Sequence, residues 1–556
     1  MTERLLLNGD VRCLDDRMTT ATAVAIADGR VKAVGSDGEL RALAGPRTEV
    51  VDLDGRTVLP GINDSHAHVG WWALATAPGT VDLRAPGTSS IADGRARVAA
   101  AASRTPRGDW ITGYGWDQNR MADGLMPSRA DLDDIAPDHP VALTHFSGHA
   151  MWVNGEALRR AGIDRHTSVP PGSVVVRDES GEPTGVLIEP GATGLVARRL
   201  PPVGIDELAG VLEGAIASLQ ARGITSYTEP ALSPGDPDRA FTGAFIDAYA
   251  LLARTGRLGA RVGVLEFFHT DGVTSAADVR DGLAAARPLR DVDARRLRIA
   301  GIKLFADGVF SGRTSWVKEE YVGGGHGSLV VAGGDDIARV RELRAAVAIA
   351  HDAGRQVQIH ATGDAAVEAS VAALADAMRA SPRSDPRHVL IHGVLTPPED
   401  LARMAAHAIL LNAQPTIARL VGANLFRLLG DARARDQSPL RSALDAGVEV
   451  ALSTDIPIAP GPDWRATVAD AVARSTEGGP VVSRQRLTLD EALRGVTVAG
   501  TVQDHAESWK GNIVAGKVAD LCVLDGRLGA DAEALRSIEV AATLVDGAFV
   551  HRSSAL

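Results

Sequence analysis

Residues 57–70 read TVLPGINDSHAHVG, an apolar strand-like run that leads into two histidines spaced as H-x-H. Side chains two residues apart on a strand point to the same face, so we expect the imidazoles of His66 and His68 to reach one point. Imidazole binds zinc, iron, nickel or manganese, and two imidazoles on one strand make half of a metal site. Because an H-x-H pair also arises by chance, the prediction depends on further ligands elsewhere in the chain.

Three more polar residues close apolar strand-like runs in the same way. His360 ends QVQIH, His392 ends HVLIH and Asp455 ends VEVALSTD, and a turn or loop follows each of them. Catalytic groups of (β/α)8 enzymes gather at the carboxyl ends of the barrel strands, and the spacings here fit one and two βα units. Each residue alone is more often a core histidine or a helix N-cap aspartate. Their recurrence at strand ends predicts a shared metal site.

Lys303 lies inside another apolar run, RLRIAGIKLFADG. An ammonium group is costly to bury without a partner, so the sequence leaves two interpretations open. In the first, Lys303 forms a salt bridge with Asp307 or Glu229. In the second, CO₂ carbamylates the lysine and converts the cation into a carboxylate that bridges two metal ions.

The middle of the chain, residues 59–507, alternates apolar strands with helical stretches rich in Ala and Arg. A predicted helix over Leu208–Arg222 precedes a strand over Gly223–Thr228, and a helix over Ala366–Ala380 precedes a strand over Val389–Ile391. This alternation indicates βα units and a parallel sheet. We predict the α/β class and a closed, TIM-like (β/α)8 barrel, with a doubly wound sheet as the alternative.

Both ends of the chain are β-rich. Asp28-Gly29 and Asp546-Gly547 each separate two short apolar runs, a pattern typical of β-hairpins. The economical arrangement is one small β-sandwich built from both ends, with a large domain inserted between them. We therefore predict a β-sandwich formed by residues 1–58 together with residues 508–556.

Residues from about 70 to 200 interrupt the rhythm of the barrel. They are rich in Gly, Pro and Trp, and VVVRDESGEPTGVLIE predicts a hairpin around Ser180-Gly181. An insertion of this length after the first barrel strand predicts a lid or substrate wall. Aromatic walls suit an apolar or aromatic substrate with one polar group, although tryptophan serves equally well as lid core. The predicted substrate-binding residues are Trp71, Trp72, Trp116, His145, Trp152 and, beyond the insertion, His326.

The composition limits the kinds of partner. A net charge of -12 argues against a nucleic acid or an anionic membrane surface. Cys13 and Cys522 imply neither a disulfide framework nor a cysteine-based zinc site. The first residues lack the apolar region of a signal peptide, and no apolar run is long enough to span a bilayer. We expect a cytoplasmic enzyme with a small-molecule substrate, and a homodimer is left open.

The order of these motifs resembles that of the amidohydrolase superfamily. The H-x-H pair, the strand lysine, HATGDAAV, IHG and STD follow one another as they do there. The sequence looks most like amidohydrolase family 3, the branch with the YtcJ-like proteins and the N-substituted formamide deformylases. Further matching blocks extend over nearly the whole chain: GHAMWVN (148–154), GEPTGVLIE (181–189), KLFADGVFSGRT (303–314) and GKVADLCVLD (516–525).

The resemblance implies a role for each candidate ligand. His66 and His68 would bind the more buried of two metal ions, and the other ion would lie at His360 and His392. A carbamylated Lys303 would bridge the two ions, and Asp455 would be both ligand and general base. The expected cofactor is therefore a divalent metal, with zinc preferred, in one or two copies per chain.

These residues predict a metal-dependent hydrolase that cleaves a non-peptide C–N bond in a formamide, an N-acyl amine or a cyclic amide. Asp455 would take a proton from a metal-activated water and deliver it to the leaving amine. A protonated histidine, His149 or His326, would polarise the scissile carbonyl, and the GHA block favours His149. The alternatives are ester hydrolysis, deamination or decarboxylation on the same barrel, and a non-catalytic binding protein.

Overall fold

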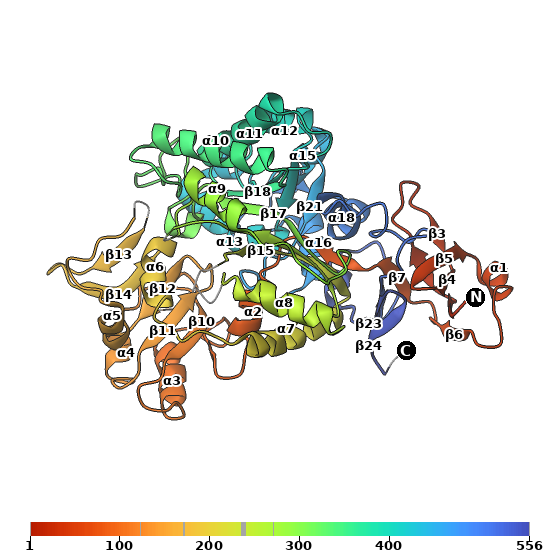
Figure 1. Cartoon of the computed structure of the whole chain (residues 1–556), viewed down its shortest axis with the longest axis horizontal. Coiled ribbons are helices and arrows are strands. Elements are labelled where there is room, and N and C mark those ends of the chain that lie inside the picture. The colour runs from red at the N-terminus through yellow and green to blue at the C-terminus, as the bar shows by residue number, and fades with distance from the viewer. Residues whose placement is uncertain (1, 123, 171–172, 235–240, 271, 555) are drawn as a thin grey trace.

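The computed structural model describes residues 2–122, 124–170, 173–234, 241–270, 272–554 and 556, and a parallel eight-stranded barrel lies at its centre (Figure 1). Neighbouring strands pair in sequence order, as expected when each strand is followed by its own crossover. The predicted (β/α)8 barrel is confirmed. Its strands are β8 (Ile62–Asp64), β15 (Ile224–Leu232), β16 (Arg261–Glu266), β17 (Leu297–Phe305), β18 (Val357–Ala361), β19 (Val389–His392), β20 (Leu410–Ala413) and β21 (Val450–Leu452).

The barrel closes where the loops after its first and last strands meet. The backbone N–H of Asp455 donates to the carbonyl of His66 at 2.9 Å, and the N–H of His68 donates to the carbonyl of Ile456 at 2.8 Å. On β8, the carboxylate of Asp64 accepts from the N–H of Thr454 at 3.0 Å. Two segments that carry candidate ligands are therefore joined directly by backbone hydrogen bonds.

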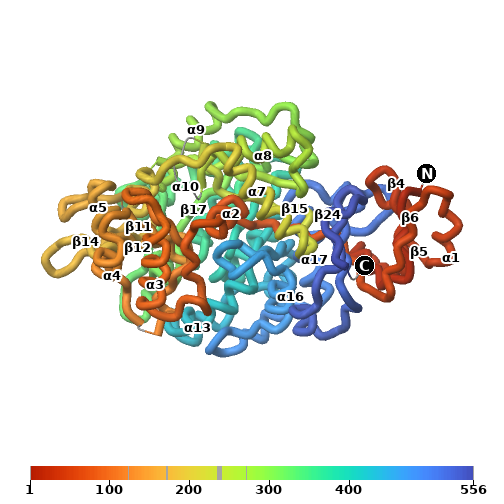
Figure 2. The backbone as a smooth tube through the Cα atoms, turned by 90° about the horizontal axis from the view of Figure 1, so that it is seen from below, coloured from red at the N-terminus to blue at the C-terminus, as the bar shows by residue number. Residues whose placement is uncertain are grey.

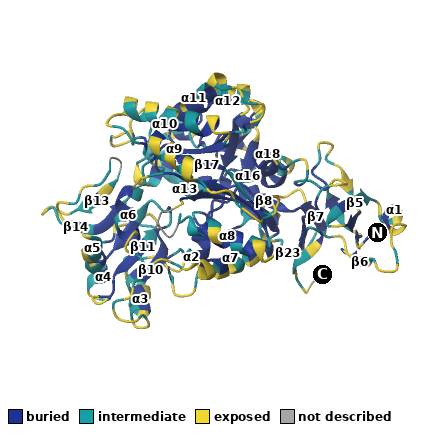
Figure 3. Ribbon diagram, in the orientation of Figure 1, coloured by how far each residue is buried: buried dark blue, intermediate teal, exposed yellow. Residues whose placement is uncertain are grey.

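Amphipathic helices cover the outside of the barrel. In α11 the apolar residues Val367, Val371 and Leu374 recur at helical spacing and are fully buried. Figure 3 shows buried strands surrounded by helices whose outer faces are exposed. Among the described residues, no helix is long and apolar enough to span a membrane. The covering helices are α7 (Ile205–Gln220), α8 (Ala244–Arg254), α9 (Ala276–Ala285), α10 (Asp336–Asp352), α11 (Asp364–Ala380), α12 (Pro398–Ala406), α15 (Leu440–Asp445) and α16 (Trp464–Ala473).

Both termini contribute to a β-sandwich, which confirms the predicted architecture. One sheet has the order β24-β23-β22-β7-β2-β3, and the other has the order β5-β4-β1-β6. Leu59 of β7 faces Cys522 of β22, so the two chain ends share one ladder. The strands are β1 (Arg4–Leu7), β2 (Asp10–Arg12), β3 (Thr20–Ala21), β4 (Ala23–Ala27), β5 (Arg30–Gly35), β6 (Glu49–Asp52), β7 (Thr57–Pro60), β22 (Leu521–Leu524), β23 (Val540–Val545) and β24 (Ala548–Arg552).

The two predicted terminal hairpins are confirmed. Asp28 and Gly29 join the antiparallel strands β4 and β5 with φ angles of 51° and 70°. Asp546 and Gly547 join β23 and β24 with φ angles of 47° and 72°. Two central residues with positive φ are what a tight type I′ hairpin requires, and Asp-Gly supplies them at low cost.

The insertion between β8 and β15 forms a sheet of its own, with the order β13-β14-β12-β11-β10-β9. It lies at the opposite end of the long axis from the terminal sandwich (Figures 1 and 2). The predicted hairpin around Ser180-Gly181 is confirmed by the antiparallel pairing of β13 and β14. The elements are α2 (Val69–Ala75), β9 (Val81–Asp82), α3 (Ile91–Ala102), β10 (Ile111–Trp116), α4 (Ala130–Asp133), β11 (Val141–His145), β12 (Ala150–Val153), α5 (Gly155–Ala161), β13 (Val174–Arg177), β14 (Pro183–Ile188) and α6 (Pro190–Ala197).

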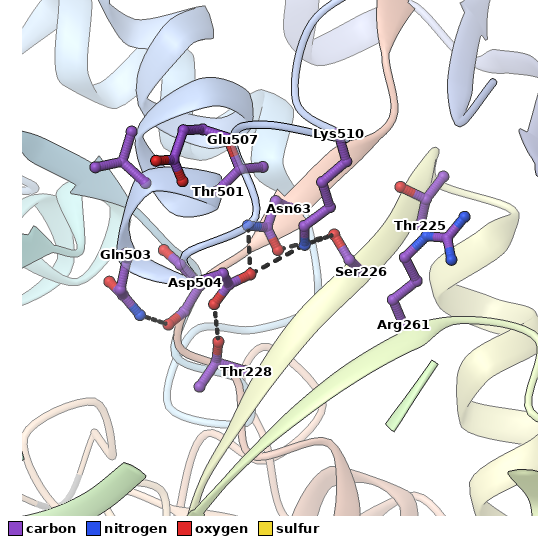
Figure 4. A network of polar contacts seen from close by, with 12 residues as sticks. Asn63, Thr225, Ser226, Thr228, Arg261, Thr501, Gln503, Asp504, Glu507 and Lys510 are labelled. Atoms are coloured by element: carbon purple, nitrogen blue, oxygen red, sulfur yellow. Dashed lines mark hydrogen bonds and ion pairs between the residues drawn. The ribbon is translucent and has the colours of Figure 1, made fainter. Parts of the chain in front are cut away.

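A buried polar network lies at the floor of the barrel, toward the end where the strands begin (Figure 4). Lys510 donates to the carboxylate of Asp504 at 3.0 Å and to the hydroxyl of Ser226 at 3.1 Å. Asn63 and Thr228 donate to the same carboxylate at 3.0 and 3.1 Å. The charges of the floor are therefore paired and hydrogen-bonded, as buried charges must be in a stable core.

Candidate metal centre

The carboxyl ends of the barrel strands open into a cavity of about 470 Å³. The strand ends and the loops that follow them supply its polar base, while aromatic and aliphatic side chains form much of its wall. All six predicted metal ligands line this cavity: His66, His68, Lys303, His360, His392 and Asp455. The structure therefore brings together residues that are up to several hundred positions apart in the chain.

Three of these side chains converge most closely. Nε2 of His66 lies 3.6 Å from Oδ1 of Asp455, and Nε2 of His68 lies 3.5 Å from the same oxygen. The expectation that both histidines lie on a strand is wrong, because β8 ends at Asp64 and His68 immediately precedes α2. The two imidazoles meet through the turn between β8 and α2, with ring centroids 5.4 Å apart.

This trio fits a divalent cation. Oδ1 of Asp455 is buried, and no described residue hydrogen-bonds to it. A buried carboxylate oxygen without a partner is costly unless a cation faces it. Ligand atoms about 2.1 Å from a tetrahedral ion lie ~3.4 Å apart, close to the spacing of these atoms. Two imidazole nitrogens and one carboxylate oxygen are also a donor set that zinc accepts.

Hydrogen bonds fix which ring nitrogen of His360 and His392 is free to bind a metal. Nε2 of His360 lies 3.0 Å from the carbonyl oxygen of Gly308, so it carries the proton and leaves the lone pair on Nδ1. Nδ1 of His392 lies 2.7 Å from Oε1 of Gln414, whose amide nitrogen donates to Asn412 and Ser453. His392 is therefore protonated on Nδ1 and presents a free Nε2. Such outer hydrogen bonds are typical of metal-binding histidines.

Lys303 is fully buried at the base of the cavity. Its Nζ lies 3.5 Å from Nε2 of His66 and 4.9 Å from the ring centroid of Phe305. Neither predicted salt-bridge partner pairs with it. Asp307 accepts from the backbone N–H groups of Trp316, Thr362 and Gly363, and Glu229 accepts from Gly70 N–H and the Tyr249 hydroxyl. Burial lowers the pKa of Lys303 and raises the pKa of Asp455, and attraction between the two opposes both shifts.

His149 reaches the cavity from the insertion. Its Nδ1 lies 2.7 Å from Oε2 of Glu189, and its ring centroid is 6.1 Å from that of His360. Burial acts to lower the pKa of His149, but the charge and hydrogen bond of Glu189 and the charges of Asp455 and Asp307 act against burial, and together they raise the pKa. The ring is therefore biased toward the imidazolium form beside four imidazoles that burial keeps neutral.

The predicted aromatic wall divides into two groups. Trp71 lines the cavity, next to Phe241 at a ring-centroid distance of 6.0 Å. Trp116 and Trp152 do not line it. They pack in the core of the insertion, where their indole N–H groups donate to the carbonyls of Leu143 and Ser128. For these two residues the alternative interpretation, lid core, is the one that the structure bears out.

Three further predicted substrate residues also lie away from the cavity. Trp72 packs in the barrel core. His145 is buried in the insertion, with Nδ1 2.8 Å from the hydroxyl of Ser147 and its ring 4.7 Å from that of Trp116. The side chain of His326 is 47% exposed, and its Nε2 lies 3.6 Å from Glu320. None of the three side chains lines the cavity, although the backbone N–H of Trp72 donates to the carbonyl of His68.

Much of the wall was missed from the sequence. The residues are aromatic and aliphatic side chains at the end of β17, in the loops after β15, β16 and β17, and in α13 (Pro415–Leu429). Glu189 and Gln414 were missed as partners of His149 and His392. Glu189 had a usable signal, because the run VLIE closes on a charged residue just as QVQIH closes on His360. The missed wall residues include Phe241, Phe267, Phe305, Phe310 and Leu425.

A (β/α)8 barrel that converges two imidazoles and a carboxylate at its carboxyl end, with two more imidazoles beside them, defines a metal-dependent hydrolase. The assignment to this class of enzyme depends on the fold and on this set of metal-donor atoms together. The chain belongs to the amidohydrolase family, whose model matches residues 49–551. The predicted family is therefore confirmed.

Relatives match over nearly the full chain. The N-substituted formamide deformylase of Arthrobacter pascens is 29% identical over 556 residues, which cover 98% of each chain. The putative amidohydrolase YtcJ of Bacillus subtilis is 29% identical over 543 residues, which cover 96% of each chain. Among solved structures, an uncharacterized metal-dependent hydrolase from Pyrococcus horikoshii shares the fold, with a TM-score of 0.72 and 23% identity. That alignment covers 95% of this chain and 99% of the other.

Proposed function

We propose that the protein hydrolyses a non-peptide C–N bond in a formamide, an N-acyl amine or a cyclic amide, with zinc as the bound metal. The observation that carries the proposal is that His66 and His68 converge on Oδ1 of Asp455 at the base of the cavity. No described residue hydrogen-bonds to this buried oxygen. The substrate class is supported by the similarity to the N-substituted formamide deformylase.

The reaction divides between the metal and the chain. A divalent ion, when bound, supplies a Lewis acid and lowers the pKa of a neighbouring water to about 7. Asp455 accepts the proton of the attacking water and returns it to the leaving amine. His149 donates a hydrogen bond from Nε2 to the scissile carbonyl oxygen as negative charge develops there.

Lys303 supports a site for two ions. A buried lysine with a lowered pKa holds a neutral amine, which can attack CO₂, form an N–C bond and release a proton. The resulting carbamate would place a bridging anion between the His66–His68 pair and the His360–His392 pair. The fixed tautomers of His360 and His392 support the second half-site, because each leaves one nitrogen free for a metal.

The wall of the cavity favours a substrate with a bulky apolar part. Trp71, Phe241 and Phe267 lie among the lining residues, together with Phe310 and Leu425. Burial of aromatic or aliphatic groups against such a wall supplies affinity, and the polar base fixes the orientation of the reacting group. An N-benzyl or N-alkyl substituent suits this division better than a charged one.

A substrate panel on metal-depleted and zinc-reconstituted protein tests the proposal. We expect zinc to restore hydrolysis of N-formyl and N-acyl amines with apolar substituents, at a kcat/KM higher than that of esters of matched shape. Product analysis should show one carboxylic acid and one amine per turnover. Zinc-dependent turnover of esters alone, or release of ammonia from an amino-heterocycle instead, would replace the proposed reaction with one of its alternatives.

A further inference from the structure

Glu189 joins the insertion to the barrel at the edge of the metal centre. It follows β14, and its side chain is only 2% exposed. One carboxylate oxygen lies 2.7 Å from Nδ1 of His149, which the insertion supplies. The other lies 2.7 Å from the hydroxyl of Thr314, in the loop after β17. A single carboxylate therefore contacts both parts of the molecule that enclose the cavity.

The backbone at Glu189 is strained. Its φ of 65° and ψ of 157° fall in a region that is nearly restricted to glycine. Such strain persists only where the surroundings enforce it, and it concentrates at functional sites. Here the N–H of Glu189 donates to the carbonyl of His149 at 2.7 Å. The Thr314 hydroxyl holds the side chain from the opposite direction.

The barrel loop is shaped to admit this carboxylate. A Cβ on Gly308 would lie 2.7 Å from Oε1 of Glu189 and 2.1 Å from the hydroxyl oxygen of Thr314. Any side chain at position 308 would therefore displace the contact between Glu189 and Thr314. The same Gly308 accepts, through its carbonyl, the hydrogen bond that fixes the tautomer of His360.

The contact also decides the protonation pattern of His149. A carboxylate only accepts hydrogen bonds, so Nδ1 of His149 must carry a proton. No described residue hydrogen-bonds to Nε2, and His149 lines the cavity. The arrangement leaves Nε2 as the ring nitrogen available to a substrate, in the way that a buried carboxylate orients a catalytic histidine in other hydrolases.

We propose that Glu189 is the positioning residue of His149, and that it holds this histidine against the metal centre by clamping the insertion to the loop after β17. The proposal rests on the proposed function, because it gives His149 a role in the reaction. It adds that His149 can act in the reaction only while Glu189 contacts both His149 and Thr314.

The Glu189→Gln variant tests the positioning role. One half of the glutamine amide can accept from Thr314, but its NH₂ then faces Nδ1 of His149, so the second bond can form only if Nδ1 gives up its proton and the ring is neutral. We expect kcat to fall about 100-fold with KM nearly unchanged, as for the loss of one donor to the transition state. Zinc content should stay at the wild-type level, because Glu189 contacts none of the six candidate ligands. Loss of zinc, or an unchanged kcat, would overturn the proposal.

A double-mutant cycle separates positioning from mere stabilisation of the insertion. His149→Gln should lower kcat about as much as Glu189→Gln. The kcat of the double variant should be no lower than that of either single variant, because both substitutions remove the same contribution of His149 to catalysis. Additive losses would mean that Glu189 acts independently of His149. Thr314→Val removes the bond to Glu189 together with the bond that the hydroxyl accepts from the N–H of Val309 in the same loop, and it should cost about five- to tenfold. Glu182→Gln, on the same hairpin and paired with the exposed Arg165, is the matched control without effect.

The crystal structure of Glu189→Ala, which removes both contacts of the carboxylate, provides a readout that does not depend on turnover. We expect the His149 ring to leave its place beside His360 while β12 and β14 keep their pairing. A ring that stays in its place beside His360 would refute the positioning role. If no tested substrate were hydrolysed by the wild-type enzyme, the proposed function would fail while this measurement still decided the role of Glu189.

Discussion

The mouth and the floor of the barrel each bury a lysine, and the two lysines have opposite surroundings. At the floor, Lys510 donates to Asp504 and Ser226, and Asp504 accepts two further hydrogen bonds (Figure 4). At the mouth, Lys303 faces an imidazole nitrogen of His66 at 3.5 Å and pairs with no carboxylate of a described residue. The same residue type is thus neutralised at one end and left without a counterion bond at the other.

The difference separates structural from functional polarity. A completed network at the floor contributes to stability and has nothing left to offer a ligand. The mouth keeps Oδ1 of Asp455 without a partner, together with two imidazole nitrogens of fixed tautomer. The cost of burying such groups is repaid when a ligand binds, so incomplete hydrogen bonding marks the reactive end of the barrel.

The largest effect is expected from Asp455→Asn at the mouth. The variant removes the proposed general base and one metal ligand, so kcat/KM should fall by about 10⁴-fold. The melting temperature of the metal-depleted protein should not fall, because a buried carboxylate without a hydrogen bond at Oδ1 is replaced by a neutral amide. Steady-state kinetics and differential scanning calorimetry on the same preparation check both parts. Full turnover would remove Asp455 from the mechanism.

A second large effect is expected from Lys303→Ala. Zinc content measured by plasma mass spectrometry should drop, and activity should fall at least about 100-fold. If the lysine is carbamylated, short carboxylic acids such as acetate or propionate should restore part of the activity by taking the place of the carbamate. The matched variant Lys510→Ala should show neither metal loss nor rescue. Normal zinc occupancy in Lys303→Ala would contradict the bridging role.

At the floor the expected loss is in stability alone. Lys510→Met leaves the buried Asp504 without its nearest cation, and the free energy of unfolding should fall by about 3 kcal/mol. Urea denaturation measures this change, and kcat of the folded fraction should equal that of the wild type. The double variant Lys510→Met/Asp504→Asn should recover part of the stability, since it also removes the uncompensated charge. A change in kcat would mean that the two ends are coupled.

The smallest effect is the contribution of His388 to the pH dependence of the free energy of unfolding. His388 immediately precedes β19, whose last residue is His392, and burial lowers the pKa of His388 to about 3, with His351 and Arg383 adding to the effect. Below about pH 6.5, His388 therefore binds a proton in the unfolded chain but stays neutral in the folded chain. This group alone should reduce the free energy of unfolding by about 1.4 kcal/mol per pH unit as the pH falls from 6.5.

His388→Asn isolates that contribution, because its side-chain oxygen can still accept from the N–H of Val357 as Nδ1 of His388 does at 3.0 Å. Unfolding by urea at pH 8, 6.5 and 5.5 should show a shallower decline for the variant than for the wild type. Parallel declines would assign the acid sensitivity to other groups.

The sequence was sufficient where local pattern and tertiary position coincide. The covering helices and inner strands of the barrel follow from their apolar periodicity, and the terminal hairpins follow from Asp-Gly pairs with positive φ. The six predicted ligands line one cavity because parallel strands bring their carboxyl ends to one side. Even the mistaken strand placement of His66 and His68 gave the correct neighbourhood, since both lie directly beyond β8.

The remainder depends on which segments approach one another after folding. Trp116 and Trp152 have the composition of a binding wall, but the sheet of the insertion turns them into its own core. Phe241, Phe305 and Leu425 form part of the actual wall although they come from a loop, a barrel strand and a helix that are far apart in the sequence. Glu189 acquires its second partner, Thr314, only when the insertion meets the loop after β17. The periodicity within a single segment does not predict these contacts between distant segments.

The pairing of β7 with β22 also means that one sheet of the sandwich cannot be completed until the end of the barrel has been translated. Strand β7 leaves the ribosome ahead of the barrel, whereas β22 is translated only after the last barrel helix. During that interval one edge of β7 presents unpaired amide and carbonyl groups, the type of surface that recruits other strands and that chaperones cover. A translation product cut short within the barrel would lack β22 and would keep that edge of β7 unpaired.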